Sequence, residues 1–345
     1  MASNNRIFYA CQSIAITPKG LIPTVNHLVH GAQSVGMNSN FTLDQVFELG
    51  QIEIYENIEN VADVEVTIEK VIDGFKLIYD LASDGNCKTD IVASSKVRCD
   101  VYVALFDDGL SHATGIPRNV VCNSGMYISS VSYNYSVDGS ATESVGFAGN
   151  DRSWNSLTNG DFGRPASGNW GYNNDISGPI MGSDSPVSGV VRRVNVLLSE
   201  AGTTSTMPSH VKFQQPSDAS VVGNSKEQHI QSITVSTDFG QENIQELGRF
   251  GPYARYATFP IEVTAEFEVI ATSGDLINVS GSHPNLGNET IIIKDSAGTI
   301  LNLGTANKLS SVSYSGGDTG GGNATITYSY SNFNVLTVHG GSGTY

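Results

Sequence analysis

Residues 32–50 read AQSVGMNSNFTLDQVFELG, and residues 230–248 read IQSITVSTDFGQENIQELG. Six of the 19 aligned positions are identical, all at the same offset of 198 residues. Unrelated segments of ordinary composition share about one identity over this length. Other positions, such as Val35 and Ile233, differ only conservatively. A repeat this long in a chain of 345 residues indicates that one domain is present twice.

The segments that follow the repeated motif alternate between apolar and polar residues in both halves of the chain. Residues 64–69 read VEVTIE, and residues 261–269 read IEVTAEFEV. A period of two is typical of a strand with one buried face and one face in water. Val-Glu-Val-Thr aligns with Ile-Glu-Val-Thr at an offset of 197. This alignment predicts that the second half has lost one residue after the motif.

A buried strand and a hairpin complete the repeat. Residues 101–107 and 291–295 are apolar runs, which favour buried strands. Residues 131–145 alternate on both sides of an Asp-Gly turn, which is a strong hairpin signal. Residues 312–328 open with the same Val-Ser-Tyr and turn through a Gly-rich stretch, so they predict a second hairpin.

Residues 73–82 change from the period of a strand to that of a helix. Their apolar side chains recur on one helical face, and Asp73 is expected to be the N-cap. The second half keeps only Gly-Asp-Leu-Ile at residues 274–277. Its helix is therefore expected to be shorter or lost.

The length of the chain suits two domains of about 150 residues each. We assign residues 1–150 to the first domain and residues 190–345 to the second. Residues 151–189 are rich in Gly, Ser and Asn and show no periodicity, so they are expected to be a linker or a long loop. Trp154 and Trp170 indicate that part of this stretch packs on a neighbouring subunit.

The chain is strongly acidic, with 34 Asp and Glu against 18 Lys and Arg and a net charge of −16. Nucleic-acid binding draws its affinity from cationic side chains that neutralise phosphates, so a specific DNA or RNA binder is disfavoured. An acidic membrane surface is disfavoured for the same reason. No secretory signal and no run of 18 apolar residues is found, which predicts a protein made and kept in a cytoplasm. The four Cys residues form no Cys-x-x-Cys pair and are expected to be reduced thiols.

No motif of catalysis or cofactor binding occurs in the sequence. Gly-x-Ser-x-Gly, P-loop and dinucleotide-binding signatures are absent. His27 and His30 form a close pair, but no acidic or Cys partner stands at ligand spacing. The Asp-Gly pairs fit turns better than a calcium loop, whose alternating Asp pattern is missing. We therefore predict that the protein is not an enzyme and holds no metal and no cofactor.

Two stretches share their order of elements with a known family. Residues 67–82 run from a strand through Asp-Gly into a short helix, and residues 132–150 form the hairpin. In this order the chain resembles the tail tube proteins of long-tailed bacteriophages, over most of residues 25–150 and, through the repeat, over residues 228–340. The resemblance implies a mainly β fold with two tandem repeats of a tail-tube-like β-sandwich or barrel domain. Each domain is expected to have a short flanking helix and a long β-hairpin.

The resemblance also implies an assembly. Six tail tube domains form a ring in this family, and the rings stack into a tube that conducts DNA during ejection. Two domains in one chain then imply three chains per ring, a homotrimer with pseudo-sixfold symmetry. The implied setting is the tail of a virion, after synthesis in the cytoplasm of a bacterial host. The implied partners are a tail sheath protein, a tape measure protein, a tail terminator and a baseplate, with DNA present only transiently and no membrane.

A tube that conducts DNA must not bind it, and a lumen lined with carboxylates repels phosphate. We therefore expect the polar faces of residues 64–69 and 261–269, together with one Glu upstream, to line the lumen. The candidate residues are Glu53, Glu65, Thr67, Glu69, Glu262, Thr264, Glu266 and Glu268.

Other functions fit the same composition. A tandem β-sandwich binding module, such as an adhesin or a carbohydrate-binding protein, would normally show a signal peptide and an aromatic platform, and neither is evident. A different virion component, such as a baseplate hub, a tail completion ring or a capsid decoration protein, keeps the setting and changes the part. Host, tail length and tail contraction leave no mark in the sequence.

Overall fold

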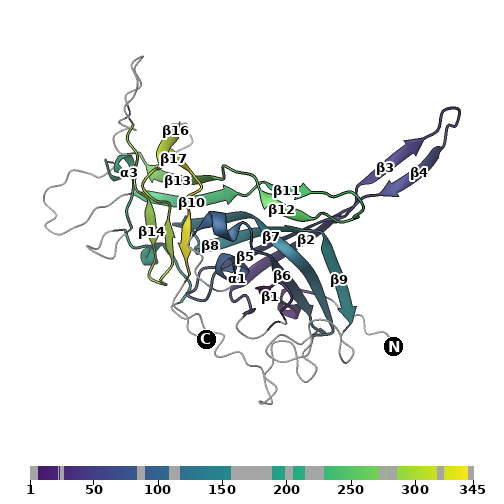
Figure 1. Ribbon diagram of the computed structural model, residues 1–345. Coiled ribbons are helices and arrows are strands. Elements are labelled where there is room, and N and C mark those ends of the chain that lie inside the picture. The colour runs from purple at the N-terminus through teal and green to yellow at the C-terminus, as the bar shows by residue number, and fades with distance from the viewer. Residues whose placement is uncertain are drawn as a thin grey trace, which may run out of the picture.

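The computed structural model shows a chain built mostly of β-strands, with a few short helices (Figure 1). The residues that the structure describes are 7–21, 23, 27–83, 90–108, 117–156, 189–198, 205–213, 229–271, 277, 286–316 and 322–340.

One antiparallel sheet runs through both halves of the chain. Its eight strands lie side by side, each hydrogen-bonded to the next. In spatial order they are β2 (Ala32–Asn40), β5 (Asp63–Val71), β8 (Thr142–Gly149), β7 (Asn119–Ser136), β10 (Ile230–Asp238), β13 (Glu262–Ile270), β17 (Thr325–Phe333) and β16 (Lys308–Ser315). We call this the main sheet. The strands predicted around residues 64–69, 131–145, 261–269 and 312–328 are thereby confirmed.

The two halves of the chain each supply four of these strands, in corresponding order. β2 and β10 both carry a bulge at the Gln of the repeated motif. In each bulge the Gln side chain donates to the carbonyl two residues earlier, over 3.2 Å for Gln33 and 3.3 Å for Gln231. β7 and β16 carry a further bulge, at Ser129 and Ser310 respectively. A bulge is a specific local feature, so its recurrence at matching positions shows that the halves follow one strand plan.

The predicted alignment of the strands after the motif is wrong by two residues. Val35 pairs with Ile68, whereas its counterpart Ile233 pairs with Phe267. The offset between β5 and β13 is therefore 199 rather than 197, and one residue has been gained rather than lost. Because the error is an even number of residues, every side chain stays on the face that the alternation predicted.

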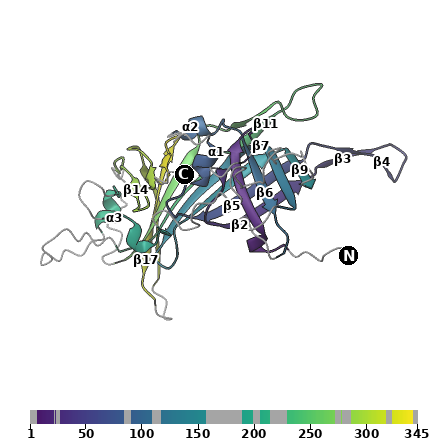
Figure 2. The same ribbon diagram turned by 90° about the horizontal axis from the view of Figure 1, so that it is seen from below.

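A second layer covers one face of the main sheet (Figure 2). β7 belongs to both layers, because its first part pairs with β6 and β9 and its last part with β8 and β10. Residues 157–188 of the expected linker lie outside the described residues, whereas its start forms β9. The strands of this layer are β1 (Gln12–Pro18), β6 (Cys99–Leu105) and β9 (Asp151–Ser156) from the first half, and β14 (Ile292–Lys294), β15 (Ile300–Asn302) and β18 (Thr337–His339) from the second.

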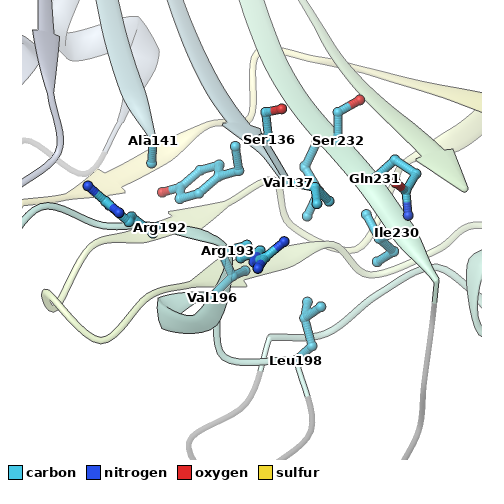
Figure 3. Close-up of a pocket in the computed structure, with 12 residues that line it drawn as sticks. Ser136, Val137, Ala141, Arg192, Arg193, Val196, Leu198, Ile230, Gln231 and Ser232 are labelled. Carbon is cyan, nitrogen blue, oxygen red and sulfur yellow. The ribbon is translucent and has the colours of Figure 1, made fainter. Parts of the chain in front are cut away.

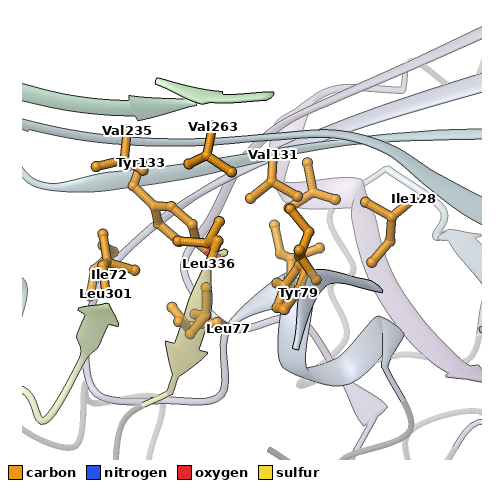
Figure 4. Packing of buried hydrophobic residues seen from close by; sticks show 14 of the residues in the cluster. Ile72, Leu77, Tyr79, Ile128, Val131, Tyr133, Val235, Val263, Leu301 and Leu336 are labelled. Atoms are coloured by element: carbon orange, nitrogen blue, oxygen red, sulfur yellow. The ribbon is translucent and has the colours of Figure 1, made fainter. Parts of the chain in front are cut away.

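The largest hydrophobic core lies between the main sheet and this layer. Side chains of β7, β10 and β13 meet those of α1 (Ile78–Ala82) and of the β15 and β18 region (Figure 4). Two other short helices are α2 (Ile91–Ser94) and α3 (Ser209–Phe213). Members of this core from both halves are Ile72, Leu77, Tyr79, Val131, Tyr133, Val235, Val263, Leu301 and Leu336. The two halves therefore share one core rather than folding apart.

Helix α1 is held by a glutamate that lies far away in the sequence. The predicted N-cap Asp73 is wrong, because the helix begins only at Ile78 and Asp73 instead contacts Lys70 over 3.4 Å. The carboxylate of Glu143 accepts the backbone N–H groups of Ile78, over 2.6 Å, and of Tyr79, over 3.0 Å. It thereby satisfies two of the N–H groups that lack partners in the first turn of a helix.

The second half places an apolar residue where the first half has this glutamate. Glu143 lies opposite Tyr133, and Ile326 lies opposite Tyr314 at the corresponding point of the second ladder. This position of the second half therefore offers no carboxylate to a helix. The helix expected to be shorter or lost in the second half lies mostly outside the described residues, which include only Ile277 of that stretch.

Replacing Glu143 by Gln is expected to lower the free energy of unfolding by about 1–3 kcal/mol, because the amide NH₂ leaves one backbone N–H without an acceptor. Burial raises the pKa of Glu143, against the opposing effect of Lys70. The folded chain therefore holds this proton more tightly than the unfolded chain, and stability falls as the pH rises from the ordinary carboxyl range through the raised pKa. Urea unfolding between about pH 4 and about pH 8 should show a smaller fall in Glu143→Gln than in wild type.

The matched control is Glu65→Gln, on the water-facing side of the main sheet, which should stay within about 0.5 kcal/mol of wild type. A Glu143→Gln protein as stable as wild type at every pH would contradict the role of this carboxylate.

Candidate assembly surfaces

The two halves meet where β10 pairs with β7, and we call this ladder the internal junction. It joins residues 130–136 to residues 232–238 in seven pairs. Beyond the ladder, the backbone N–H of Phe239 donates to the carbonyl of Ser129 over 2.8 Å. The side chain of Phe239 is fully buried. The main sheet therefore continues from one half into the other without a break.

Polar contacts fix the internal junction at both ends. The guanidinium of Arg255, only 7% exposed, donates to Asp63 over 2.6 Å and to Asn150 over 3.1 Å. At the other end the hydroxyl of Tyr135 donates to Asp295 over 3.2 Å, and burial raises the pKa of Asp295. The guanidinium of Arg255 also donates to the carbonyl of Gly149 over 3.3 Å. Loss of Asp295 would leave the buried hydroxyl of Tyr135 without its acceptor, so these contacts hold the halves in one relative position.

The main sheet ends at β2 on one side and at β16 on the other. Within the described part of the chain, neither strand has a partner on its outer edge. Phe41 follows β2 as Phe239 follows β10, yet Phe41 is 74% exposed. Tyr314 of β16 corresponds to the fully buried Tyr133 of β7, yet it is 61% exposed. Residues that are buried at the internal junction are thus exposed at the two free edges.

Two hairpins leave the main sheet, one after β2 and one after β10. The first consists of β3 (Leu43–Phe47) and β4 (Ile54–Glu59), and the second of β11 (Gln241–Ile244) and β12 (Ala254–Ala257). Every residue from 41 to 60 is exposed, and the first hairpin projects from the body of the molecule (Figure 1). A two-stranded hairpin is marginally stable alone in water, so this apolar one suits a contact with another molecule. Its exposed large apolar residues are Phe41, Leu43, Val46, Phe47, Leu49, Ile52, Ile54, Tyr55 and Ile58.

The face of the main sheet opposite the core carries most of the residues expected to line a lumen, and we call it the open face. Side chains of β5 and β13 alternate between the core and this face. The ladder registers bring the polar residues of both strands onto the same face. Neighbouring residues on this face in β7, β8, β10 and β17 are mainly Ser and Thr, and none is Lys or Arg. On the edge strand β16, Lys308 lies opposite Ser331 and adds one cation to this face. The expected residues found here are Glu65, Thr67, Glu69, Glu262, Thr264, Glu266 and Glu268.

Three expected site residues lie elsewhere or outside the described part. Glu53 lies in the first hairpin, just before β4, and does not share the open face with the other candidates. Trp154, expected to contact another subunit, lies in β9 and is 60% exposed. Trp170 lies outside the described residues.

The described residues include no group of three or more His, Cys, Asp or Glu that could hold a metal ion. His30 stacks on Phe75 with ring centroids 4.1 Å apart, and burial lowers the pKa of His27. The three described Cys residues are buried free thiols. No helix in this part of the chain is long and apolar enough to cross a membrane.

The β-rich sequence indicated strand edges that neighbouring chains would pair, but it did not indicate which strands form those edges or that Phe41 marks one of them. A signal was present, because Phe41 is one of the six identical positions of the repeat. It could be interpreted only once the strand order showed that its counterpart Phe239 is buried against the other half.

Several solved structures align with part of this chain. The cap that terminates the tube of the anti-feeding prophage is 10% identical and aligns with 46% of this chain and 95% of its own, with a TM-score of 0.34. A sheath-tube complex of the extracellular contractile injection system PVC, in the extended state, is 9% identical over 45% of this chain and 95% of its own, with a TM-score of 0.34. The baseplate of the anti-feeding prophage is 8% identical over 44% and 97%, with a TM-score of 0.32. A comparison with curated protein sequences finds no match.

The start of the chain matches a protein family. Residues 9–94 match the family model described as Phi812 tail tube protein. This span contains β2 with its free edge, the first hairpin, β5 and helix α1. The resemblance to bacteriophage tail tube proteins drawn from the sequence is thereby confirmed over residues 9–94, and the match does not extend to a second copy.

Proposed function

We propose that the protein is a structural subunit of a phage-type tail tube, in which each chain supplies two tail tube domains and three chains close into a ring. The family match over residues 9–94 supports the structural role. The shared strand order and bulges of the two halves support a second tail tube domain. The ring rests on one observation: β16 and β2, which correspond to β7 and β10 of the internal junction, are the two unpaired edges of the main sheet among the described residues. We call the proposed contact between β16 of one chain and β2 of the next the open junction.

The internal junction supplies the register for this open junction. In the internal junction Ser236 lies opposite Ser132. The repeat offset of 198 residues relates Ser236 to Asn38, and the shared Val-Ser-Tyr relates Ser132 to Ser313. Asn38 of one chain is therefore expected opposite Ser313 of the next. Pairing in this register would satisfy the backbone groups of both free edges at once.

Phe41 takes the place of Phe239 in this arrangement. The backbone N–H of Phe239 bonds to Ser129, and the corresponding acceptor for Phe41 is Ser310 of the next chain. The aromatic ring, exposed in a single chain, would become buried as that of Phe239 is. Burial of a Phe side chain contributes about 1.5–3 kcal/mol, which favours closure of the ring.

The number of chains follows from the strand plan. A contact between β16 of one chain and β2 of the next is heterologous, so it generates a ring if the rotation between neighbours closes. In this plan, the contact between the two halves of one chain has the same geometry as the contact between adjacent chains. Six domains per ring, the number in tail tube rings, then require three chains with pseudo-sixfold symmetry.

Closing the sheet directs one of its faces toward the ring axis. The face that packs on the second layer is covered by the core, so the open face is the one that can line the channel. Its glutamates and hydroxyl groups give a negative surface, which repels phosphate and leaves DNA mobile. We assign Glu65, Glu69, Glu262, Glu266 and Glu268 to this lining and leave Glu53 out.

The proposed setting is the tail of a virion. The outer layer of each ring would face a sheath protein, and the ends of the tube would meet the baseplate and a terminator. The lumen would hold a tape measure protein and then DNA in transit. Electron microscopy of the purified protein tests the role directly: hollow tubes support it, whereas rings that never stack fit a cap or a hub.

The double variant Asn38→Cys with Ser313→Cys is expected to form disulfides between neighbouring chains, because residues directly opposite in an antiparallel ladder lie within disulfide range. Non-reducing gel electrophoresis after mild oxidation should show covalent dimers and trimers and nothing larger, since a ring of three closes on itself.

The register control is Asn38→Cys with Ser315→Cys, a pair displaced by two residues and thus about 7–8 Å apart, which should cross-link poorly. Cross-linked species larger than three chains would overturn the trimeric ring. Equal cross-linking by both pairs would overturn the register.

Phe41→Asp is expected to raise the protein concentration needed for ring formation by at least about tenfold, because a charge replaces an apolar side chain that becomes buried in the ring. Sedimentation velocity should then show monomers under conditions where wild type forms rings. The matched control Phe47→Asp changes a 63% exposed Phe of the first hairpin and should leave ring closure intact. Rings of Phe41→Asp as stable as those of wild type would refute the open junction.

Lysine at three open-face positions, in the variant Glu65→Lys/Glu266→Lys/Glu268→Lys, is expected to make assembled tubes retain a short DNA duplex in low salt and release it in high salt. Wild-type tubes should not retain it in either buffer. The control carries the same three charge reversals on the first hairpin, at Asp44, Glu56 and Glu59. Equal DNA retention by both variants would show that the open face does not line the channel.

A further inference from the structure

The two hairpins end in the same turn. Its sequence is Glu-Leu-Gly, at residues 48–50 and 246–248. The Gly has a positive φ in both, 97° in the first turn and 83° in the second, and a hydrogen bond across each turn closes it. Gly adopts this conformation readily, so the turn is well defined. The Leu at its tip is fully exposed in both hairpins.

A hollow with apolar walls lies at the opposite end of the main sheet, where β10 begins (Figure 3). Two arginines, Arg192 and Arg193, are exposed beside it, and neither takes part in an ion pair among the described residues. We call it the arginine hollow. Its half-buried apolar side chains are Val137, Val196, Leu198 and Ile230.

The two turns differ in whether their Glu has a cation nearby, and this difference indicates which turn would bind in the arginine hollow. Glu246 of the second turn has a cation close by, since Arg249 approaches it to 4.0 Å. Glu48 of the first turn has no such partner in the described part of the chain. The hollow beside the start of β2 contains Asp73 and, among its described lining, no arginine. An acidic turn is therefore complementary in charge to the arginine hollow, and not to the hollow beside the start of β2.

We infer that the Glu48-Leu49-Gly50 turn of one chain docks into the arginine hollow of a second copy of the chain in the next ring. Leu49 fills the apolar part of the hollow, and Glu48 pairs with Arg193. β10 is nine residues long, so the hollow lies about 30 Å from the strand end that leads to the hairpins. A contact between opposite ends of one molecule is heterologous and does not close, so it stacks rings into a growing tube. The inference rests on the proposed ring.

The test uses charge exchange in the full-length protein, with rings and tubes counted by electron microscopy and pelleting. Leu49→Asp should give free rings and raise the concentration needed for tubes by at least about tenfold. Glu48→Arg and Arg193→Glu should each impair stacking, and the double variant should restore it. Leu247→Asp, the same change at the second turn, should leave tubes intact.

Tubes of Leu49→Asp that form as readily as those of wild type would overturn the inference, and so would a double charge exchange that fails to restore stacking. In either case rings of three chains would still stand, because ring closure uses other residues. A wild-type chain that stays monomeric at high concentration would instead overturn the proposed ring and, with it, the docking of the turn.

Discussion

Backbone hydrogen bonding at the edges of the main sheet is the constraint on which the rest of this structure depends. An unpaired strand edge in water invites pairing with another chain, so proteins close, cover or pair such edges. Inside the chain, β7 and β10 meet this need by pairing with each other. The same solution is available to β16 and β2 only between chains. The exposure of Phe41, against the burial of Phe239, marks the position where that pairing is missing.

The two halves follow one strand plan, but they are not interchangeable. Glu143 anchors helix α1 in the first half, whereas Ile326 stands at its place in the second. Arg255 binds Asp63 at the internal junction, whereas the first hairpin carries Asn57 at the corresponding position. The internal junction therefore has an ion pair of a buried Arg with a half-exposed Asp, which the first hairpin cannot form with Asn57. In the proposed ring, the contact between chains would therefore be weaker than the one inside the chain, which suits a subunit that folds first and assembles later.

The sequence was sufficient for local features and for their repetition. Alternation placed the strands and faces of β5 and β13 correctly, because a period of two survives an alignment error of two residues. It failed where distant residues decide. Asp73 is a good N-cap by type, yet Glu143, 65 residues from Ile78, holds the helix. The joining of both halves into one sheet depends on pairing between strands about a hundred residues apart, which no local pattern records.

The central claim is that β16 and β2 of neighbouring chains pair as β7 and β10 do within one chain. Electron cryo-microscopy of assembled rings measures this most directly. The account predicts threefold rings of three 36.6 kDa chains, with the main sheets joined into one continuous barrel and the open face toward the axis. Rings of six chains, or rings in which the β2 and β16 edges remain apart, would contradict it.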